Sequence, residues 1–241
     1  MRHDIHSLII YEDPHIIVCR KPAGIPTQTA RIGTSDMESM LKNYLSGGYL
    51  AVIHRLDQPV EGLLVFAKTP RAAKELNRQL TAAGFGKYYR ALVSGIPDPS
   101  EGTLEDYLVK DARTNTSRVC TKNTPGAKTA RLHYRTEKIY RDTSPVTSLV
   151  EIHLDTGRHH QIRVQMAHLG CPLVGDRKYG AVQSCRTTPG KDIPPASTPP
   201  ASTPPASQTP EGPLRLCAYR LEFRHPVSGE KMTFMLEENP W

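Results

Sequence analysis

The segment whose residues are best suited to chemistry is His54-Arg55-Leu56-Asp57-Gln58-Pro59, which lies between two apolar stretches. In an extended chain Arg55 and Asp57 project to the same face, because side chains alternate along a strand. Pro59 also biases the residue before it toward extended backbone. A cation and a carboxylate are thus held close together at a strand end. This arrangement is suited to catalysis, although an exposed ion pair would show the same pattern.

A second polar segment, Asp155 to Arg163, reads DTGRHHQIR. It predicts a strand end, a glycine turn and the start of a helix, where backbone donors and arginines favour a phosphate or carboxylate. Metal ligation by His159 and His160 is the alternative. Adjacent histidines on a strand point to opposite faces, however, and no carboxylate lies beside them at helical ligand spacing. We therefore expect no metal, and we expect His160 to make structural hydrogen bonds.

A third segment, GKYYRALV at residues 86–93, predicts a strand on which Tyr89 shares a face with Lys87, Ala91 and Val93. A tyrosine on that face is able to stack on an unpaired base. An ordinary core tyrosine would give the same pattern.

The remaining elements must position these three segments. Helices are predicted over Ser35 to Leu45, after the capping residue Thr69 with Pro70 in the first turn, and over a stretch carrying Ile162, Met166 and Leu169. Apolar runs predict strands at 8–11, 16–20, 51–53, 62–68, 87–93, 129–135, 147–155, 214–223 and 231–236. Many strands, few helices and an irregular order favour an α+β domain with a mixed or antiparallel sheet.

Composition narrows the class of protein. A formal net charge of +7 in 241 residues is compatible with a polyanionic partner, although a solvated basic surface is equally compatible. The five cysteines are scattered without CxxC spacing, which favours free thiols in a reducing compartment. No segment has the length and apolar character of a signal peptide or a membrane span, so we expect a cytoplasmic protein with no membrane partner.

One segment differs from the rest, because residues 183–213 are rich in proline and repeat PPAST. We expect a disordered or polyproline-II insertion there, and a partner-binding tract is the alternative. The rest of residues 1–241 is expected to form a single catalytic domain.

Taken together, the polar segments resemble the RluA-type pseudouridine synthases in content and order. The matching motifs are RKPAGI at 20–25, HRLDQPVEGLLVFAK at 54–68, KYYRALVSG at 87–95, TGRHHQIRV at 156–164 and LGCPLVGD at 169–176, followed by Tyr179-Gly180. The resemblance runs from about Leu8 to Leu236 apart from the insertion. It implies a mixed, mostly antiparallel sheet flanked by helices, with a basic cleft between two halves and no separate N-terminal RNA-binding domain.

The resemblance also implies roles for individual residues. Asp57 matches the catalytic aspartate, Tyr89 the tyrosine that packs against the target base, and Arg163 the arginine that pairs with the carboxylate and holds it ionised. Arg55 matches the arginine that enters the RNA stack as the base leaves. Further RNA contacts are assigned to basic side chains of the same motifs: His54, Lys87, Arg158 and His160.

Two departures from the family pattern bear on this expectation. Val60 and Glu61 replace the usual Thr-Ser, and His159 replaces a Thr or Ser. We expect the added carboxylate of Glu61 to alter RNA contacts or to raise the pKa of Asp57 by repulsion.

The function expected from the resemblance is conversion of specific uridines to pseudouridine in structured RNA, either rRNA or tRNA, by a monomer that needs no cofactor or metal. Asp57 would either attack ribose C1′ or assist the departure of uracil, and the sequence leaves both routes open. Two other functions remain possible at this stage. One is an RNA-binding scaffold without activity, and the other is a metal-dependent hydrolase using Asp57 and His160.

Overall fold

A computed structural model of the chain describes residues 4–31, 33–82, 84–180, 212–237 and 241. Within these residues, one sheet of eleven strands runs through the molecule in the order β1-β2-β4-β10-β5-β9-β8-β6-β7, with β3 beside β4 and β11 beside β10. Neighbouring strands are antiparallel, apart from the parallel pair β4 and β10. The strands are β1 Ile9–Glu12, β2 Ile16–Lys21, β3 Ala51–Val52, β4 Glu61–Ala67, β5 Gly86–Ser94, β6 Glu101–Asp111, β7 Thr116–Cys120, β8 Lys128–Tyr140, β9 Thr147–Leu154, β10 Leu216–Arg224 and β11 Lys231–Met235. The predicted α+β class is confirmed.

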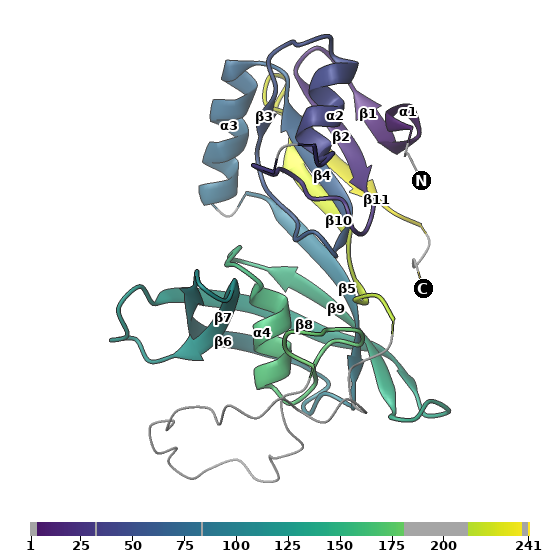
Figure 1. Cartoon of the computed structure of the whole chain (residues 1–241), viewed down its shortest axis with the longest axis vertical. Helices are drawn as coiled ribbons and strands as arrows, with labels where there is room; N and C mark the ends of the chain where they lie inside the picture. Colours follow the sequence, from purple (N-terminus) through teal and green to yellow (C-terminus); the bar gives the residue numbers. More distant parts are fainter. Residues whose placement is uncertain (1–3, 32, 83, 181–211, 238–240) are drawn as a thin grey trace.

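The sheet passes through two halves, which β5 joins (Figure 1). One half holds β1 to β4, β10 and β11 with three helices, α1 (Ile5–Leu8), α2 (Met37–Tyr44) and α3 (Pro70–Thr81). The other half holds β6 to β9 with α4 (Gln161–His168). No helix among the described residues is both long and apolar enough to span a bilayer.

The predicted helix after Thr69 is confirmed, with its local signals in place. The Thr69 hydroxyl accepts a hydrogen bond from the Ala72 N–H at 3.2 Å, and Pro70 occupies the first turn. For α2, the helix starts one residue later than a Ser35 cap would place it, because the Asp36 carboxylate accepts the Ser39 N–H at 2.7 Å.

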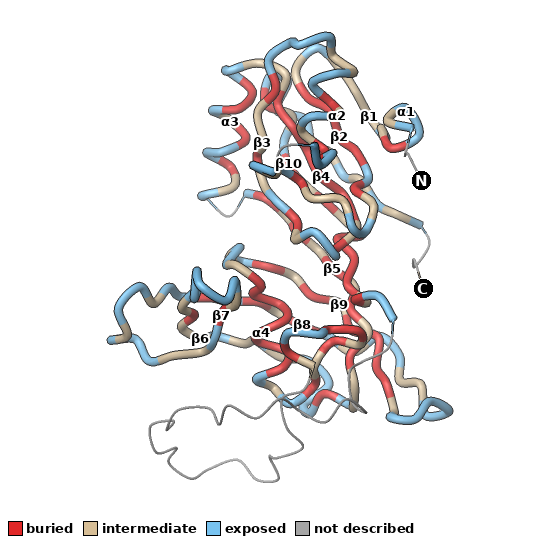
Figure 2. Tube along the Cα trace, in the orientation of Figure 1, coloured by how far each residue is buried: buried red, intermediate tan, exposed pale blue. Residues whose placement is uncertain are grey.

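The core of the first half lies on both faces of β4. Leu64 and Phe66 pack in the cluster that contains the buried residues of α2, whereas Leu63 and Val65 pack with those of α3. Burial on both faces explains why this strand reads as an uninterrupted apolar run instead of an alternating one. Figure 2 shows the tube of β4 largely in the colour of buried residues.

Two strands, β6 and β7, end the sheet on one side and were not predicted from the sequence. In β6 exposed and half-buried positions alternate, and Leu108 is its buried apolar residue. The half-buried positions 102, 104 and 106 hold Gly, Leu and Asp, so the alternation in burial is not matched by an alternation of apolar and polar residues in the sequence. The proline-rich insertion predicted at 183–213 lies, up to residue 211, outside the described residues.

Candidate active site

Asp57 lies in the irregular segment between β3 and β4, and hydrogen bonds fasten this segment to the loop after β2. The Thr27 hydroxyl donates to the carbonyl of Leu56 at 3.0 Å and accepts the Leu56 N–H at 3.1 Å. On the other side of Asp57, the Gln58 side-chain amide donates to the carbonyl of Gly24 at 3.0 Å, and the Gly24 N–H donates to the carbonyl of Gln58 at 2.8 Å. The residues on both sides of the carboxylate are therefore fixed.

A buried lysine, Lys21, also fixes this segment. The Lys21 ammonium group donates to the carbonyls of Pro22 at 3.0 Å, Ile25 at 2.6 Å and Gln58 at 3.1 Å. Burial lowers the pKa of Lys21 to about 8, against the opposing charges of Asp57 and Glu61. The sequence alone did not indicate this role for Lys21, since a lysine at the end of an apolar strand more often faces solvent.

Several of the residues predicted for the site meet around Asp57. Arg163 Nη1 lies 3.7 Å and His160 Nε2 lies 3.6 Å from Asp57 Oδ2. Tyr89 is buried on β5, on the face that also carries Lys87, Ala91 and Val93, as expected. Burial raises the pKa of Tyr89, and the nearby charge of Asp57 raises it further, so its ring stays neutral.

Burial gives the pKa of Asp57 a net rise, although Arg163 lowers this pKa as expected. Burial raises the pKa and outweighs the lowering by Arg163 and Lys21. The like charge that adds to this rise belongs to Asp176. Glu61, the expected source of repulsion, instead forms an ion pair with Arg20 at 3.2 Å.

Arg163 has its tighter contacts with Asp176. Its Nε and Nη2 each donate to one Asp176 oxygen at 2.7 Å, and the Asp176 side chain is fully buried. Burial works against the charge of Arg163, but the hydrogen bond and charge of Asp176 together with the charge of Asp57 raise its pKa. Asp176 also accepts the N–H groups of Lys178 at 2.9 Å and Tyr179 at 3.2 Å. The arginine is thereby held in one orientation.

His160 makes the structural hydrogen bond expected of it. The hydroxyl of Tyr179 lies 2.7 Å from His160 Nδ1 and accepts the Ser117 N–H at 2.8 Å, so its own proton is free to go to the histidine. Burial, followed by the charge of Arg163, lowers the pKa of His160 to about 3. A neutral His160 that accepts at Nδ1 carries its proton at Nε2, the nitrogen that faces Asp57.

The two adjacent histidines do not point to opposite faces, as a strand would require. Their rings stack with centroids 3.7 Å apart, because His160 adopts φ 55° at the start of α4. His159 is fixed by Ser117 Oγ at 2.8 Å and by Asn115 Oδ1 at 3.1 Å. Among the described residues, no group of three or more His, Cys, Asp and Glu side chains is arranged to hold a metal ion.

Two of the residues assigned to RNA contacts lie against the protein interior. His54 Nε2 accepts the Val65 N–H at 3.4 Å and its ring packs against Phe85, while burial and then Lys87 lower its pKa to about 3. Lys87 is itself buried, and burial lowers its pKa against the charge of Asp155.

Two more of the five, Arg158 and Arg55, lie at the surface, and the fifth, His160, lies beside Asp57. Arg158 is exposed and donates from Nε to the carbonyl of Thr129 at 2.8 Å. Arg55 is exposed, and within the described residues its guanidinium makes no hydrogen bond or ion pair. None of the four residues other than His160 is hydrogen-bonded or ion-paired to Asp57. They therefore do not belong to the group that Arg163 and His160 form around Asp57.

The chain resembles known proteins in sequence and in fold. The family model described as RNA pseudouridylate synthase matches residues 15–168. The dual-specificity RNA pseudouridine synthase RluA of Salmonella typhimurium is 30% identical over 228 residues, covering 94% of this chain and 91% of that protein. The uncharacterized RNA pseudouridine synthase YhcT of Bacillus subtilis is 36% identical over 177 residues, covering 71% of this chain and 57% of that protein.

The shared length and the fold complete the comparison. The chain spans between 42% and 65% of the length of four of its curated relatives. Human RNA pseudouridylate synthase domain containing 1 has the same fold, with a TM-score of 0.71 and 21% identity, covering 99% of this chain and 86% of that one. The chain belongs to the RNA pseudouridylate synthase family and, within it, to the RluA type.

Proposed function

We propose that the protein converts uridine to pseudouridine in RNA, with Asp57 as the nucleophile. The observation that carries this proposal is the position of the Asp57 carboxylate, 3.7 Å from Arg163 and beside the buried ring of Tyr89, in a chain of this family. The carboxylate is partly exposed, with 30% of its side chain accessible, so a substrate can reach it.

The chemistry suits a carboxylate. The bond from ribose C1′ to uracil N1 breaks, and its electron pair leaves with the uracil. The ring then turns, C1′ bonds to C5, N1 gains a proton and C5 loses one. No oxidation or reduction occurs. Asp57 assists either by bonding to C1′ or by stabilising the developing positive charge while uracil departs.

Access to the uridine requires that it leave its stack. This costs a few kcal/mol and least where the base is already unpaired, so the substrate is a uridine in a loop or bulge of a structured RNA, rRNA or tRNA. Arg55 extends into solvent two residues before Asp57 and is placed to fill the gap in the stack. The neutral ring of Tyr89 supplies an apolar surface for the uracil.

The test is Asp57→Asn, which keeps the shape of the side chain and removes the negative charge. Wild-type protein and the variant are each incubated with RNA from cells that lack the protein, and pseudouridine is mapped at nucleotide resolution. We expect new pseudouridines with the wild type and none with the variant, while RNA affinity is retained. Asp142→Asn, at an exposed turn, is the control for loss of one surface carboxylate. Modification by Asp57→Asn at the wild-type rate would overturn the assignment.

A further inference from the structure

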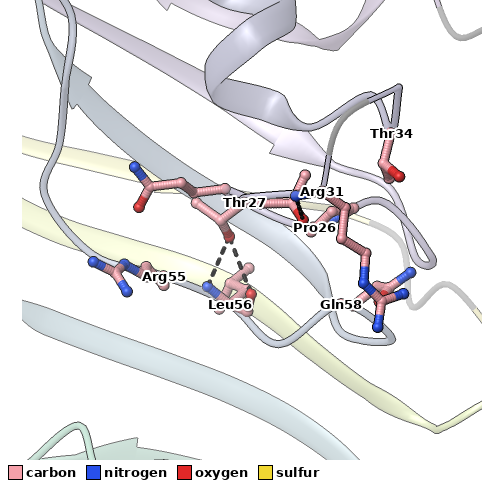
Figure 3. A pocket seen from close by; sticks show the side chains of 9 residues that line it. Pro26, Thr27, Arg31, Thr34, Arg55, Leu56 and Gln58 are labelled. Atoms are coloured by element: carbon pink, nitrogen blue, oxygen red, sulfur yellow. Dashed lines mark hydrogen bonds between the residues drawn. The ribbon is translucent and has the colours of Figure 1, made fainter.

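A pocket of about 290 Å³ opens beside the Asp57 segment, on the side of the loop after β2. One wall is formed by residues of the loop after β2, and the other by the segment that carries Asp57 (Figure 3). The lining residues are Pro26, Thr27, Gln28, Thr29, Arg31 and Thr34 on the first wall and Arg55, Leu56 and Gln58 on the second. In this view Arg55 lies at one end, and Arg31 extends toward Gln58 at the other. Asp57 itself does not line the pocket, so the pocket is distinct from the group around the carboxylate.

The lining has the chemistry of a nucleotide site. It combines hydroxyls, side-chain amides and two guanidinium groups, and it includes no carboxylate. The neighbouring acid, Asp36, is buried and does not line the pocket, and its two oxygens accept the N–H groups of Thr29 at 2.6 Å and Ser39 at 2.7 Å.

The cations of the pocket are available to a ligand. Within the described residues, the guanidinium of Arg31 makes no hydrogen bond or ion pair, and Arg31 is exposed. The same holds for the side-chain amide of Gln28. An exposed arginine without an acidic partner binds phosphate at a small free-energy cost of desolvation, and its planar donors match the phosphate oxygens.

The pocket has a fixed position relative to Asp57. The hydrogen bonds between Thr27 and Leu56 join its two walls. Leu56 and Gln58, which line the pocket, are the residues on either side of Asp57. A nucleotide in the pocket would therefore contact the chain neighbours of Asp57, which suits a nucleotide next to the target in the same strand.

We propose that this pocket receives the nucleotide that flanks the target uridine, with Arg31 bound to its phosphate and Gln28 facing its base. This inference rests on the proposed function and deepens it, because it names a second point at which the RNA is read. Recognition would thus depend on the neighbour of the uridine as well as on the extruded uracil.

The experiment pairs changes in the protein with changes in the RNA. The probe is a synthetic stem-loop that spans a segment of cellular RNA retained by the Asp57→Asn protein. It is made with a neutral methylphosphonate in place of each phosphate near the uridine in turn. RNA affinity is measured for the Asp57→Asn protein with and without Arg31→Ala. The value of kcat/KM is measured for the wild type and for the single variant Arg31→Ala. Arg71→Ala, an exposed arginine of α3, removes the same charge elsewhere.

We expect Arg31→Ala to weaken binding and kcat/KM about tenfold, and we expect one methylphosphonate position to have the same effect on the parent protein. At that position the two changes should not add, because they remove the same contact. Additive effects at every position, or a loss no larger than in Arg71→Ala, would refute the pocket. Failure of the proposed function looks different: no pseudouridine forms on any RNA, yet the affinities still decide whether Arg31 contacts a flanking phosphate.

Discussion

Arg163 donates two 2.7 Å hydrogen bonds to Asp176 while its Nη1 lies 3.7 Å from Asp57, so two carboxylates share one guanidinium. The closer carboxylate is the fully buried one. Asp176 therefore sets the orientation of Arg163, in which Nη1 faces Asp57. The counter-ion of the proposed nucleophile is positioned by a residue that need not touch the substrate.

The first prediction concerns Asp176→Asn. Removal of one charge from a buried pair leaves the other uncompensated, so the free energy of unfolding should fall by about 3 kcal/mol. The rate of pseudouridine formation should fall as well, because Arg163 loses its anchor. Urea denaturation and release of the uridine C5 proton measure the two effects. Asp142→Asn should change neither, and equal behaviour of the two variants would count against a role for Asp176.

The second prediction concerns the pH dependence of Arg163→Ala. The proposed nucleophile must be ionised, so activity rises as pH rises through the pKa of Asp57. Arg163 is the foremost group that lowers this pKa against the effect of burial. Its loss should therefore move the rising limb to higher pH, by about one to three units. Arg163→Lys retains a charge and should show a smaller shift.

Single-turnover rates from acidic to neutral pH measure this shift. An unmoved limb in Arg163→Ala would show that the arginine does not act on the ionisation of Asp57.

The third prediction separates Arg55 from Arg163. Arg55 is exposed and not bonded to Asp57, so Arg55→Ala should not shift the rising part of the pH–rate profile. Its cost should depend on the RNA, with activity partly restored when the uridine is already unpaired. The measurement compares a stem-loop with a matched unstructured RNA. If the loss is the same on both, Arg55 does not replace the extruded base.

Local signals in the sequence predicted some parts of this molecule and not others. The helix α3 follows from Thr69 and Pro70, because a cap and a first-turn proline act through neighbours in the chain. Asp57, Tyr89 and Arg163 were found through motif resemblance, and the structure brings them together. Asp176 lies within a matched motif, but its pairing with Arg163 depends on how the chain turns after α4, which no local pattern records.

The buried Lys21 and the stacked histidines were missed for a related reason. Lys21 is stabilised by three carbonyls that converge only after the loop 22–27 meets Gln58. The stacking of His159 on His160 depends on a left-handed backbone at His160, which is uncommon for a residue other than glycine. Both depend on tertiary contacts that override residue preference.

The fourth prediction concerns Tyr179→Phe, which removes the hydroxyl between Ser117 and His160. Loss of the hydrogen bond to His160 Nδ1 frees the ring to change tautomer, so Nε2 no longer consistently carries a proton toward Asp57. We expect kcat to fall several-fold with KM unchanged, and stability to fall by about 1 kcal/mol.

Steady-state kinetics and urea denaturation test this prediction. Tyr140→Phe, at a half-buried tyrosine of β8, is the matched control and should leave kcat as it is. A rise in KM alone in Tyr179→Phe would assign the tyrosine to RNA binding instead.

The last prediction uses Lys21, whose pKa is lowered by burial from 10.5 to about 8. The folded protein therefore holds this proton less tightly than the unfolded chain, and unfolding takes up a proton between these two values. Burial of the charged ammonium group destabilises the folded protein, and this effect is fully present below about pH 8 and decreases as pH rises toward 10.5. The free energy of unfolding of the wild type should therefore increase across this pH range relative to that of Lys21→Met. Lys21→Met should also be less stable at neutral pH, because three carbonyls lose their donor. The difference between the two unfolding free energies, followed by urea denaturation as a function of pH, cancels groups common to both proteins. A difference that stays constant from pH 8 to 10.5 would mean that Lys21 keeps its ordinary proton affinity.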